Sequence, residues 1–371
     1  MASILIISFV EWAGAFQRPQ HLALGLARRG WRVTYASPGY LHRRARRVES
    51  GLDLPPNLTI VQPPALPGAG RVAALAALNR WLMRRGVPDA PGSDPGEPWD
   101  VVLFNDPRWA GLARSLRGAM RIFDCMDDLS AAAPAGESAA AMEARALEVA
   151  DRVWTGTASL ADRLTGRHPR VRFIPCGVDA ERFAAPDPQL IRAVAGDLPP
   201  GEGPLAGYFG ALNERFDMER VEALLESGPW RVVLIGPASS RCPRLPRTAR
   251  LRAIGPRPYA QLPAYLAHFD LALIPYDTRG PHRFLYPVKA LEYLAGEKPV
   301  LSTPLPDIVR FLGDYVELAD TREDWRAAGQ RLLADRAAAI EKARRGALYA
   351  RSRSWAAMLD EMENELREGR T

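Results

Sequence analysis

The sequence predicts an α/β protein built from two Rossmann-like domains in tandem. Its 371 residues are enough for two domains with separate cores. Short apolar runs typical of buried parallel strands alternate with stretches of helical periodicity, and turns rich in Gly, Pro and Asp separate them. The alternation begins afresh at LAGYFGAL, residues 205–212, which indicates a second domain.

The first half opens with a predicted buried strand, SILIISF. The helix RPQHLALGLARRG follows it, with Pro19 suited to the first turn and Gly30 to the exit. The next predicted strands are WRVTYAS, LTIVQP, DVVLFND, MRIFDCM, RVWTGT and VRFIPCG. Segment 65–98 contains a predicted helix that places four apolar side chains on one face: Leu75, Leu78, Trp81 and Leu82. It is either an ordinary surface helix or an interfacial helix on a membrane.

The second half repeats the pattern. Its predicted strands are LAGYFGAL, WRVVLIGP, LRAIGPR, DLALIPYD and KPVLSTP, and its predicted helices are DMERVEALLESG, YAQLPAYLAHF and PVKALEYLAGE. The halves join near CGVDAERFAAPDPQ, which predicts an N-terminal domain over 1–178 and a C-terminal domain over 179–349. Beyond residue 325 the chain is expected to be helical, and one apolar stripe marks the last helix: Trp355, Met358, Leu359, Met362 and Leu366.

Composition narrows the class of protein. No uninterrupted apolar run reaches the about 18 residues of a membrane span. The start, MASILIISFVEWAG, is typical of a first strand rather than a signal peptide. Three widely spaced cysteines, Cys125, Cys176 and Cys242, argue against a disulfide framework or a zinc site. We therefore expect a cytoplasmic protein.

Positive charge is concentrated in one part of the chain. The net charge is +6, and the stretch from Arg18 to Arg85 contains twelve arginines but only two acids, Glu49 and Asp53. This stretch forms either solvated helix faces or a basic surface for an anionic membrane or substrate. Basic residues are not interleaved with stacking aromatics, so no nucleic-acid partner is expected.

Two common nucleotide-binding loops are missing. A dinucleotide site would show GxGxxG after a strand, but the first turn, FVEWAGAFQRPQ, has only Gly14. The corresponding turn of the second half, YFGALNERFDME, has only Gly210, and no Walker loop occurs. Hydride transfer and ATP hydrolysis are therefore poorly supported.

Lys289 is one of only three lysines in the chain, beside 46 arginines. Pro287 would start a helix and place Lys289 at about its third position. Tyr286 cannot cap the free amides, and a cation there opposes the helix dipole by about 0.3–1 kcal/mol. An uncapped start with an ammonium group suits a bound diphosphate.

Glu292 lies on the same face as Lys289, three residues further on. A carboxylate there can accept two hydrogen bonds from a ribose diol. The pair therefore predicts a phosphate-and-ribose site, with an ordinary intrahelical salt bridge as the alternative.

The stretch PVKALEYLAGEKPVLSTPLPD resembles the donor site of GT-B glycosyltransferases related to glycosyltransferase family 4 and to xanthan-type glucuronosyltransferases. FQRPQHLALGLARRGWRVTYASP, FDCMDDLS, FIPCGVDAERF, GYFGALNERFD and AHFDLALIPY follow the same order, and the resemblance covers most of 1–325. It implies two Rossmann-like domains facing a central cleft. It also implies that the C-terminal helix, 350–371, returns to the N-terminal domain.

The resemblance implies that the C-terminal domain binds a nucleoside-diphosphate sugar, with UDP the expected nucleotide. Lys289 would meet the diphosphate and Glu292 the ribose. The other expected donor-binding residues are Pro287, Val288, Gly210, Arg215 as a phosphate ligand and Arg257, whose loop would contact the nucleobase. Many family members carry a second glutamate where this chain has Phe284, so retention or inversion cannot be carried over.

The N-terminal domain would hold the acceptor. Resemblance to the glucuronosyltransferase places the catalytic base at Asp127, although Asp127 or Asp128 could instead cap the following helix. The expected acceptor-binding residues are Gly14, Arg18, His21 and Asp128, with a packed structural role as the alternative for His21.

The function these features imply is transfer of a sugar to a glycan or lipid-linked acceptor in cell-envelope or exopolysaccharide synthesis, with peripheral contact at an anionic membrane. The nucleotide sugar is a co-substrate, and no other cofactor is expected. No Asp-x-Asp occurs, which fits metal-independent transfer. The alternatives are a nucleotide-sugar epimerase of the same fold and a non-catalytic nucleotide-sugar-binding protein.

Overall fold

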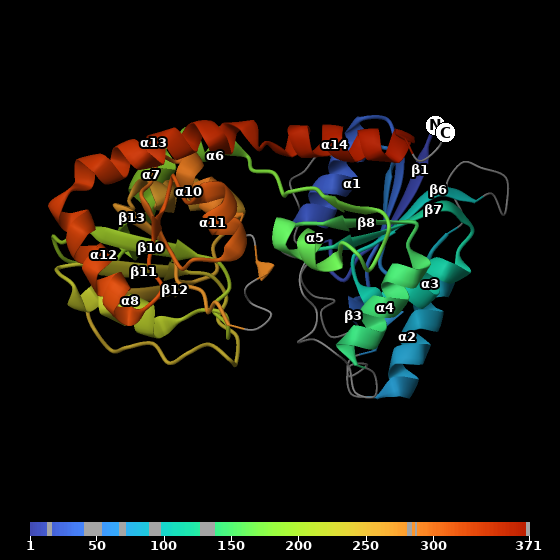
Figure 1. Ribbon diagram of the computed structural model, residues 1–371, viewed down its shortest axis with the longest axis horizontal. Coiled ribbons are helices and arrows are strands. Elements are labelled where there is room, and N and C mark those ends of the chain that lie inside the picture. Colours follow the sequence, from blue (N-terminus) through green and yellow to red (C-terminus); the bar gives the residue numbers. More distant parts are fainter. Residues whose placement is uncertain are drawn as a thin grey trace. The chain divides into compact units, whose positions relative to one another are not determined.

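The computed structural model describes residues 1–12, 17–40, 54–66, 72–88, 98–126, 138–279, 284–285 and 288–368. The chain divides into two compact units, Met1–Cys176 with Ala356–Thr371, and Gly177–Trp355. Each unit has one large parallel sheet flanked by helices (Figure 1). The predicted α/β class, with a Rossmann-like sheet in each half, is confirmed.

The sheet of the first unit has seven strands among the described residues, and all neighbouring pairs are parallel. Their order is β4 (Leu58–Val61), β2 (Arg32–Ala36), β1 (Ser3–Ile7), β6 (Trp99–Phe104), β7 (Gly118–Cys125), β8 (Arg152–Thr155) and β9 (Val171–Phe173). A separate short pair joins β3 (Gly39–Tyr40) to β5 (Pro64–Ala65). Without that pair the order is that of a doubly wound fold with one added strand, and its switch point lies between β1 and β6.

The helices of the first unit connect these strands. They are α1 (Arg18–Arg28), α2 (Ala73–Gly86), α3 (Ala110–Ser115) after a 3-10 turn at Pro107–Trp109, α4 (Ala139–Val149) and α5 (Ala158–Leu164). All five residues of the central strand β1 are buried. This burial is expected of a parallel strand covered on both faces.

The last helix, α14 (Trp355–Glu368), packs on the first unit, as the resemblance implied. Its predicted apolar stripe is confirmed, with four buried side chains: Met358, Leu359, Met362 and Leu366. The helix lies so close to α1 that a Cβ on Gly25 would be 2.2 Å from Cδ1 of Leu359. An ion pair of 3.0 Å joins Arg152 of β8 to Glu365.

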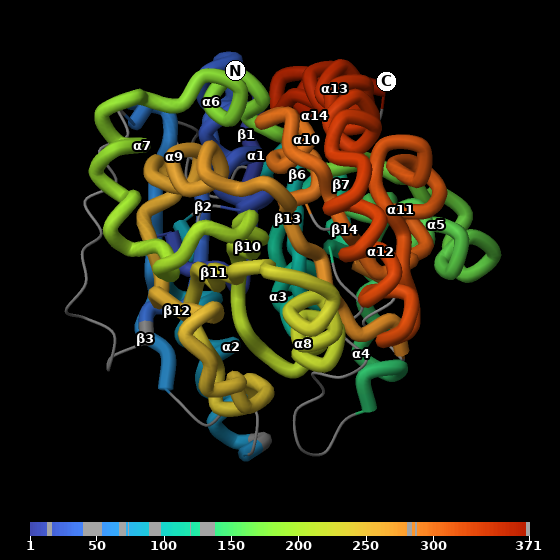
Figure 2. Tube along the Cα trace, turned by 90° about the vertical axis from the view of Figure 1, so that its left-hand side faces the viewer, coloured from blue at the N-terminus to red at the C-terminus, as the bar shows by residue number. Residues whose placement is uncertain are grey.

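The second unit has a six-stranded parallel sheet within the described ranges. Its order is β12 (Leu251–Gly255), β11 (Arg231–Ile235), β10 (Leu205–Phe209), β13 (Leu271–Ile274), β14 (Val300–Ser302) and β15 (Glu317–Leu318). Figure 2 shows the sequence from β12 through β10 to β14 across this sheet. This is again the doubly wound 3-2-1-4-5-6 order, with the switch point between β10 and β13.

The helices of the second unit follow its strands. They are α6 (Ala180–Ala184), α7 (Pro188–Val194), α8 (Met218–Glu226), α9 (Leu262–Ala267), α10 (Lys289–Ala295), α11 (Pro306–Leu312), α12 (Arg322–Ala334) and α13 (Arg336–Ser352), with 3-10 turns at Ala195–Asp197 and Tyr259–Gln261. The helical region predicted beyond residue 325 is confirmed by α12, α13 and α14. The core of this unit is continuous through β10, β11, β13 and the buried face of α10.

Candidate functional site

The switch point of the second unit holds the ammonium group of Lys289. This nitrogen donates to the hydroxyl of Tyr208 at 3.0 Å and to that of Tyr276 at 2.5 Å. Tyr208 belongs to β10, and Tyr276 comes two residues after β13. The two strands that border the switch point therefore each supply a tyrosine to the lysine. Ligands of doubly wound sheets bind at this point, outside the carboxyl ends of the strands.

The rings of the same two tyrosines also face the charge. Nζ of Lys289 lies 4.2 Å from the ring centroid of Tyr208 and 5.0 Å from that of Tyr276. Burial and the neighbouring Tyr276 raise the pKa of the Tyr208 phenol well above its ordinary value, so the phenol stays neutral. Within the described ranges no carboxylate lies in ion-pair distance of Lys289. Its charge is thus held by neutral groups and is available to an anion.

Two glycines leave room for this arrangement. Gly210 follows β10 and Gly236 follows β11, with φ angles of 145° and 146°. A Cβ on Gly210 would lie 2.2 Å from Nζ of Lys289, and one on Gly236 would lie 2.0 Å from the carbonyl oxygen of Gly210. At both positions a residue larger than glycine is disfavoured, because the φ angle is positive and because neighbouring atoms occupy the place of a Cβ. The absence of side chains at these two positions therefore lets the Lys289 ammonium and the main chain of Gly210 pack closely at this edge of the sheet.

Tyr293 fixes the helix that carries Lys289. The amide of Phe209, the last residue of β10, donates to the Tyr293 hydroxyl at 3.0 Å, and the two rings meet edge to face at 4.6 Å. Tyr293 lies one turn after Lys289 on α10. The end of β10 and the start of α10 are therefore held together as one structure.

Glu292 does not form the intrahelical salt bridge with Lys289 that was the alternative interpretation. Its Oε1 accepts a hydrogen bond of 2.9 Å from the hydroxyl of Tyr259. The residue is 8% exposed, and burial raises the pKa of its carboxyl group to about 7, although Tyr259 and Lys289 both act to lower it. Glu292 is thus a buried acid whose hydrogen-bond partner is neutral.

The start of α10 differs from the prediction in one respect. Lys289 is the first residue of the helix rather than about the third, and Val288 precedes it with helical angles and no side-chain capping bond. Pro287 lies outside the described residues. The expectation of an uncapped start is confirmed. Because the helix has only seven residues, its dipole is a minor contribution beside the Lys289 ammonium.

The two predicted donor-site arginines have different surroundings. Arg215 lies close enough to Tyr208 for its charge to lower the pKa of that phenol in part, and its carbonyl accepts from the amide of Asp277 at 2.8 Å. The guanidinium of Arg257 donates to Tyr265 at 2.8 Å and to Asp197 at 3.1 Å. The side chain of Arg257 thus makes local structural contacts, and the nucleobase contact expected of its loop stays a prediction.

In the first unit, Arg18 is a buried brace. It is 3% exposed and forms a two-pronged pair with Asp124 at the end of β7, with Nη2–Oδ1 and Nε–Oδ2 distances of 2.9 and 3.0 Å. Its Nη1 donates to the carbonyl of Ile174 at 2.7 Å and lies 3.9 Å from Sδ of Met358. Burial acts to lower the pKa of Arg18, but Asp124 and Cys176 together outweigh it and raise that pKa. The acceptor role of Arg18 stays a prediction, and its observed contacts are structural.

The other predicted acceptor residues are not brought together by the described part of the structure. His21 lies half-buried in the first turn of α1. Gly14, Asp127 and Asp128 lie outside the described residues. The catalytic role of Asp127 therefore remains a prediction.

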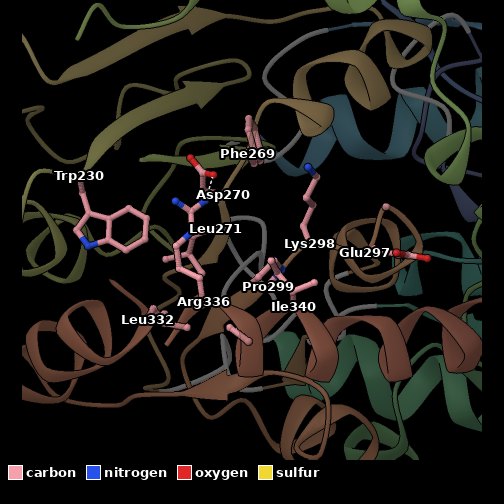
Figure 3. Close-up of a pocket in the computed structure, with 12 residues that line it drawn as sticks. Trp230, Phe269, Asp270, Leu271, Glu297, Lys298, Pro299, Leu332, Arg336 and Ile340 are labelled. Atoms are coloured by element: carbon pink, nitrogen blue, oxygen red, sulfur yellow. Dashed lines mark hydrogen bonds and ion pairs between the residues drawn. The ribbon is translucent and has the colours of Figure 1, made fainter. Parts of the chain in front are cut away.

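A cavity of about 320 Å³ lies elsewhere in the second unit (Figure 3). Its lining includes Trp230, Phe269, Asp270 and Pro299, which stand at the amino ends of strands, with Arg336 reaching Asp270 from α13. None of the predicted donor-binding residues lines it. Because Rossmann-like sheets bind ligands at the opposite edge, the Lys289 site is the stronger candidate.

The tyrosines of the site, Tyr208, Tyr259 and Tyr276, were not predicted from the sequence. The first two occupy apolar or turn segments that resemble ordinary core, and no spacing pattern links them to Lys289. A partial clue was available, because each of GYFG and LIPY places a tyrosine at the carboxyl end of a predicted strand.

The described residues include no group of three or more His, Cys, Asp or Glu side chains placed to hold a metal ion. Among the helices in these ranges, none is long and apolar enough to cross a membrane.

The chain is similar to known proteins in sequence. Residues 13–177 match the family model of the glycosyl transferase 4-like domain. Over 180 residues the chain is 27% identical to TuaH of Bacillus subtilis, named for a glycosyltransferase of teichuronic acid biosynthesis. That match covers 46% of this chain and 44% of TuaH, less than half of either protein.

Solved structures share the whole fold. A sucrose-phosphate synthase from Thermosynechococcus elongatus superimposes with a TM-score of 0.77 at 16% identity, covering 99% of each chain. Anabaena HepE in complex with UDP-glucose gives a TM-score of 0.74 at 14% identity, covering 99% of this chain and 100% of HepE. At such identities the likeness establishes the GT-B fold. The chain therefore has the GT-B fold, and its residues 13–177 are similar to the glycosyl transferase 4-like domain.

Proposed function

We propose that the protein is a glycosyltransferase that takes a sugar from a nucleoside-diphosphate sugar, with UDP as the nucleotide. The acceptor would be a glycan or a lipid-linked sugar in cell-envelope or exopolysaccharide synthesis, at the cytoplasmic face of the membrane. The observation that carries the proposal is the Lys289 ammonium, held by neutral phenols at the switch point of the second unit. The printed names of TuaH and HepE support the reaction class and the nucleotide.

The donor's diphosphate would occupy the position beside Lys289 and the glycines that follow β10 and β11. During transfer the bond between the sugar's anomeric carbon and the diphosphate oxygen breaks, and negative charge develops on the leaving diphosphate. Lys289, with Arg215 as a second cation, would stabilise that charge. The Glu292 carboxylate would accept hydrogen bonds from the ribose hydroxyls in place of its bond from Tyr259.

The first unit would bind the acceptor. A new bond forms between the acceptor oxygen and the anomeric carbon, and the acceptor's proton must pass to a base. For the case of an inverting reaction we assign this base to Asp127, with Gly14, Arg18, His21 and Asp128 around the acceptor. The assignment rests on the family resemblance of FDCMDDLS.

Calorimetric titration with a panel of nucleotides tests the donor site. We expect UDP to bind, and Lys289→Ala to weaken binding at least tenfold, or about 1.4 kcal/mol, because the diphosphate loses its cation. Lys342→Ala is the matched control, since Lys342 is a lysine of the same unit whose near charge is Glu317 at 3.8 Å. Unchanged affinity in Lys289→Ala would refute the donor assignment.

A donor-hydrolysis and acceptor screen then tests transfer. Asp127→Asn should keep its affinity for UDP and lose transfer, because an amide cannot take the acceptor's proton. Full transfer by this variant would exclude Asp127 as the base. Conversion of the UDP-sugar without acceptor would instead indicate an epimerase, and binding without any turnover a binding protein.

A further inference from the structure

The cavity of Figure 3 lies at the amino edge of the second unit's sheet, whereas Lys289 stands at the carboxyl edge. Trp230 precedes β11, Asp270 precedes β13 and Pro299 precedes β14, so the starts of three strands border the cavity. Its volume of about 320 Å³ is at the small end of ligand-binding pockets, which span about 300–1,000 Å³. No step of the proposed sugar transfer uses this cavity.

Most of the side chains that line the cavity are apolar. Trp230 and Phe269 are each 2% exposed and Leu271 is 1% exposed, so the core of the unit holds them in place. Leu332 of α12 and Ile340 of α13 complete the apolar lining from the helices. An apolar ring in this space would be removed from water, which is favourable.

The two acids that line the cavity already have partners. Asp270 pairs through Oδ1 with Arg336, and its Oδ2 accepts a hydrogen bond of 2.7 Å from the amide of Leu205. Glu297 pairs at 3.7 and 3.8 Å with two arginines of α13 that do not line the cavity. Neither carboxylate therefore offers an unmatched negative charge to a cationic ligand.

The two cations of the lining have donors that remain available. Arg336 donates to Asp270 from Nη2, and its guanidinium has no further protein partner within the described residues. Lys298 donates to the carbonyl of Ala267 at 2.8 Å, and an ammonium group has further N–H donors. Burial lowers the pKa of Lys298, and a negative charge beside it would act to raise that pKa. Because Glu297 is matched by its own arginines, these two cations oppose the single acid Asp270, and the cavity has an excess of positive charge.

We propose that this cavity binds a small amphipathic monocarboxylate, with its apolar ring against the buried aromatic side chains and its carboxylate on Arg336 and Lys298. A carboxylate matches the planar guanidinium of arginine and forms charge-assisted hydrogen bonds with it. An uncharged apolar molecule would leave those donors unused, and a cation would meet the excess positive charge. A diphosphate would bring more negative charge than the cavity can offset beside Asp270, so the ligand is distinct from the sugar donor.

Calorimetric titration of the full chain with sodium naphthoate tests the proposal, and naphthylmethanol serves as the uncharged analogue. We expect one naphthoate to bind to each chain and the alcohol to bind about tenfold more weakly, since it lacks the charge-assisted hydrogen bonds. Equal binding of the acid and the alcohol would contradict the role of the two cations.

The same titration separates this cavity from the donor site. Saturating UDP and the variant Lys289→Ala should both leave naphthoate binding unchanged, because Lys289 stands at the other edge of the sheet. The result therefore does not depend on whether UDP binds. Competition by UDP, or lost binding in Lys289→Ala, would place the anion at the donor site and overturn the proposal.

Two substitutions at the ion pair should change the affinity for naphthoate in opposite directions. Arg336→Gln should weaken binding about tenfold, because the guanidinium is lost and Asp270 is left to repel the anion. Asp270→Asn should strengthen binding, since the amide oxygen can still accept from Leu205 while the competing charge is gone. The control for net charge is Arg345→Gln, because Arg345 is an exposed arginine of the same helix that does not line the cavity. Equal loss in Arg345→Gln, or weaker binding by Asp270→Asn, would refute the assigned recognition.

A further substitution tests the cavity itself without a change of charge. Ala339 lines the cavity, so Ala339→Phe should fill the space and abolish naphthoate binding. Ala337 of the same helix is exposed and does not line the cavity, so Ala337→Phe should bind as the wild type does. Circular dichroism checks that both variants keep their helices. An absence of naphthoate binding in the wild type, or unchanged binding by Ala339→Phe, would overturn the proposal.

Discussion

The carboxyl group of Glu292 is buried beneath Tyr259, and its proton is held more tightly in the folded protein than in the unfolded chain. Its pKa rises from 4.5 to about 7 on burial. The folded state is therefore favoured by this group below about pH 4.5, and that contribution is lost as the pH rises through about 7. The difference between the two values corresponds to about 3 kcal/mol.

Urea unfolding of the ligand-free protein measures this effect. We expect the midpoint of the second unit to fall between about pH 5 and pH 8 in the wild type, and to fall less in Glu292→Gln, which cannot ionise. Every other titratable group is common to both proteins, so the difference between the two curves isolates Glu292. Parallel curves would contradict the assigned burial.

Lys289 and Glu292 could be singled out from the sequence because lysine is rare in this chain and a cation at the start of a helix opposes the helix dipole. The residues that form hydrogen bonds with Lys289 and Glu292 could not be identified in this way. Tyr208 and Tyr276, which form hydrogen bonds with Lys289, are 81 and 13 residues away from it in the sequence. Arg18 was expected to bind the acceptor, but it is buried and paired with Asp124, which is 106 residues away in the sequence. Neither its burial nor its partner can be seen without the three-dimensional structure. Long-range pairing, rather than local pattern, determines such roles.

At the level of elements, periodicity predicted which faces of the helices are apolar but not always which face turns inward. In α14 the apolar stripe is the buried one. In α2 the predicted stripe includes the exposed Leu78 and Trp81, while the polar Asn79 is buried because Leu66 satisfies its amide. An inward polar side chain with main-chain partners leaves no trace in a hydrophobic pattern.

The Arg18–Asp124 pair joins four elements of the first unit. It connects the start of α1 to the end of β7, to Ile174 just after β9 and to Met358 of α14. Arg18→Met would leave the Asp124 carboxylate buried and unpaired. We expect this change to destabilise the unit by about 3–5 kcal/mol.

Thermal unfolding followed by circular dichroism measures the loss. The double variant Arg18→Met/Asp124→Leu should recover part of it, because the unpaired charge is gone. Arg29→Met is a suitable comparison, since Arg29 is a more exposed arginine paired with Asp360 of α14 and should change stability far less. If Arg18→Met keeps wild-type stability and loses only transfer, Arg18 is an acceptor ligand rather than a brace.

At the scale of the whole chain, both units have the same doubly wound strand order, so topology alone does not say which one binds the nucleotide. The alternation of strands and helices in the sequence predicted two such sheets, but strand order depends on crossovers that no local pattern records. The charged side chains at the strand ends differ between the units, and they favour the second unit for the proposed nucleotide. In the first unit, the cations described near the strand ends are paired with acids, as Arg18 is with Asp124 and Arg108 with Asp106. In the second, the hydrogen-bond partners of Lys289 among the described residues are the neutral hydroxyls of Tyr208 and Tyr276.

This asymmetry predicts where nucleotide protects the main chain. With saturating UDP, hydrogen–deuterium exchange should slow in the second unit, at the ends of β10 and β11 around Gly210 and Gly236 and in the first turn of α10. Bound ligand stabilises only the conformations that bind it, so amides that exchange by opening of this site are protected in proportion to occupancy. Lys289→Ala, measured at the same UDP concentration, should lose most of that protection, and Lys342→Ala should retain it. Protection centred on the ends of β1 and β6 in the first unit would reverse the assignment of donor and acceptor units.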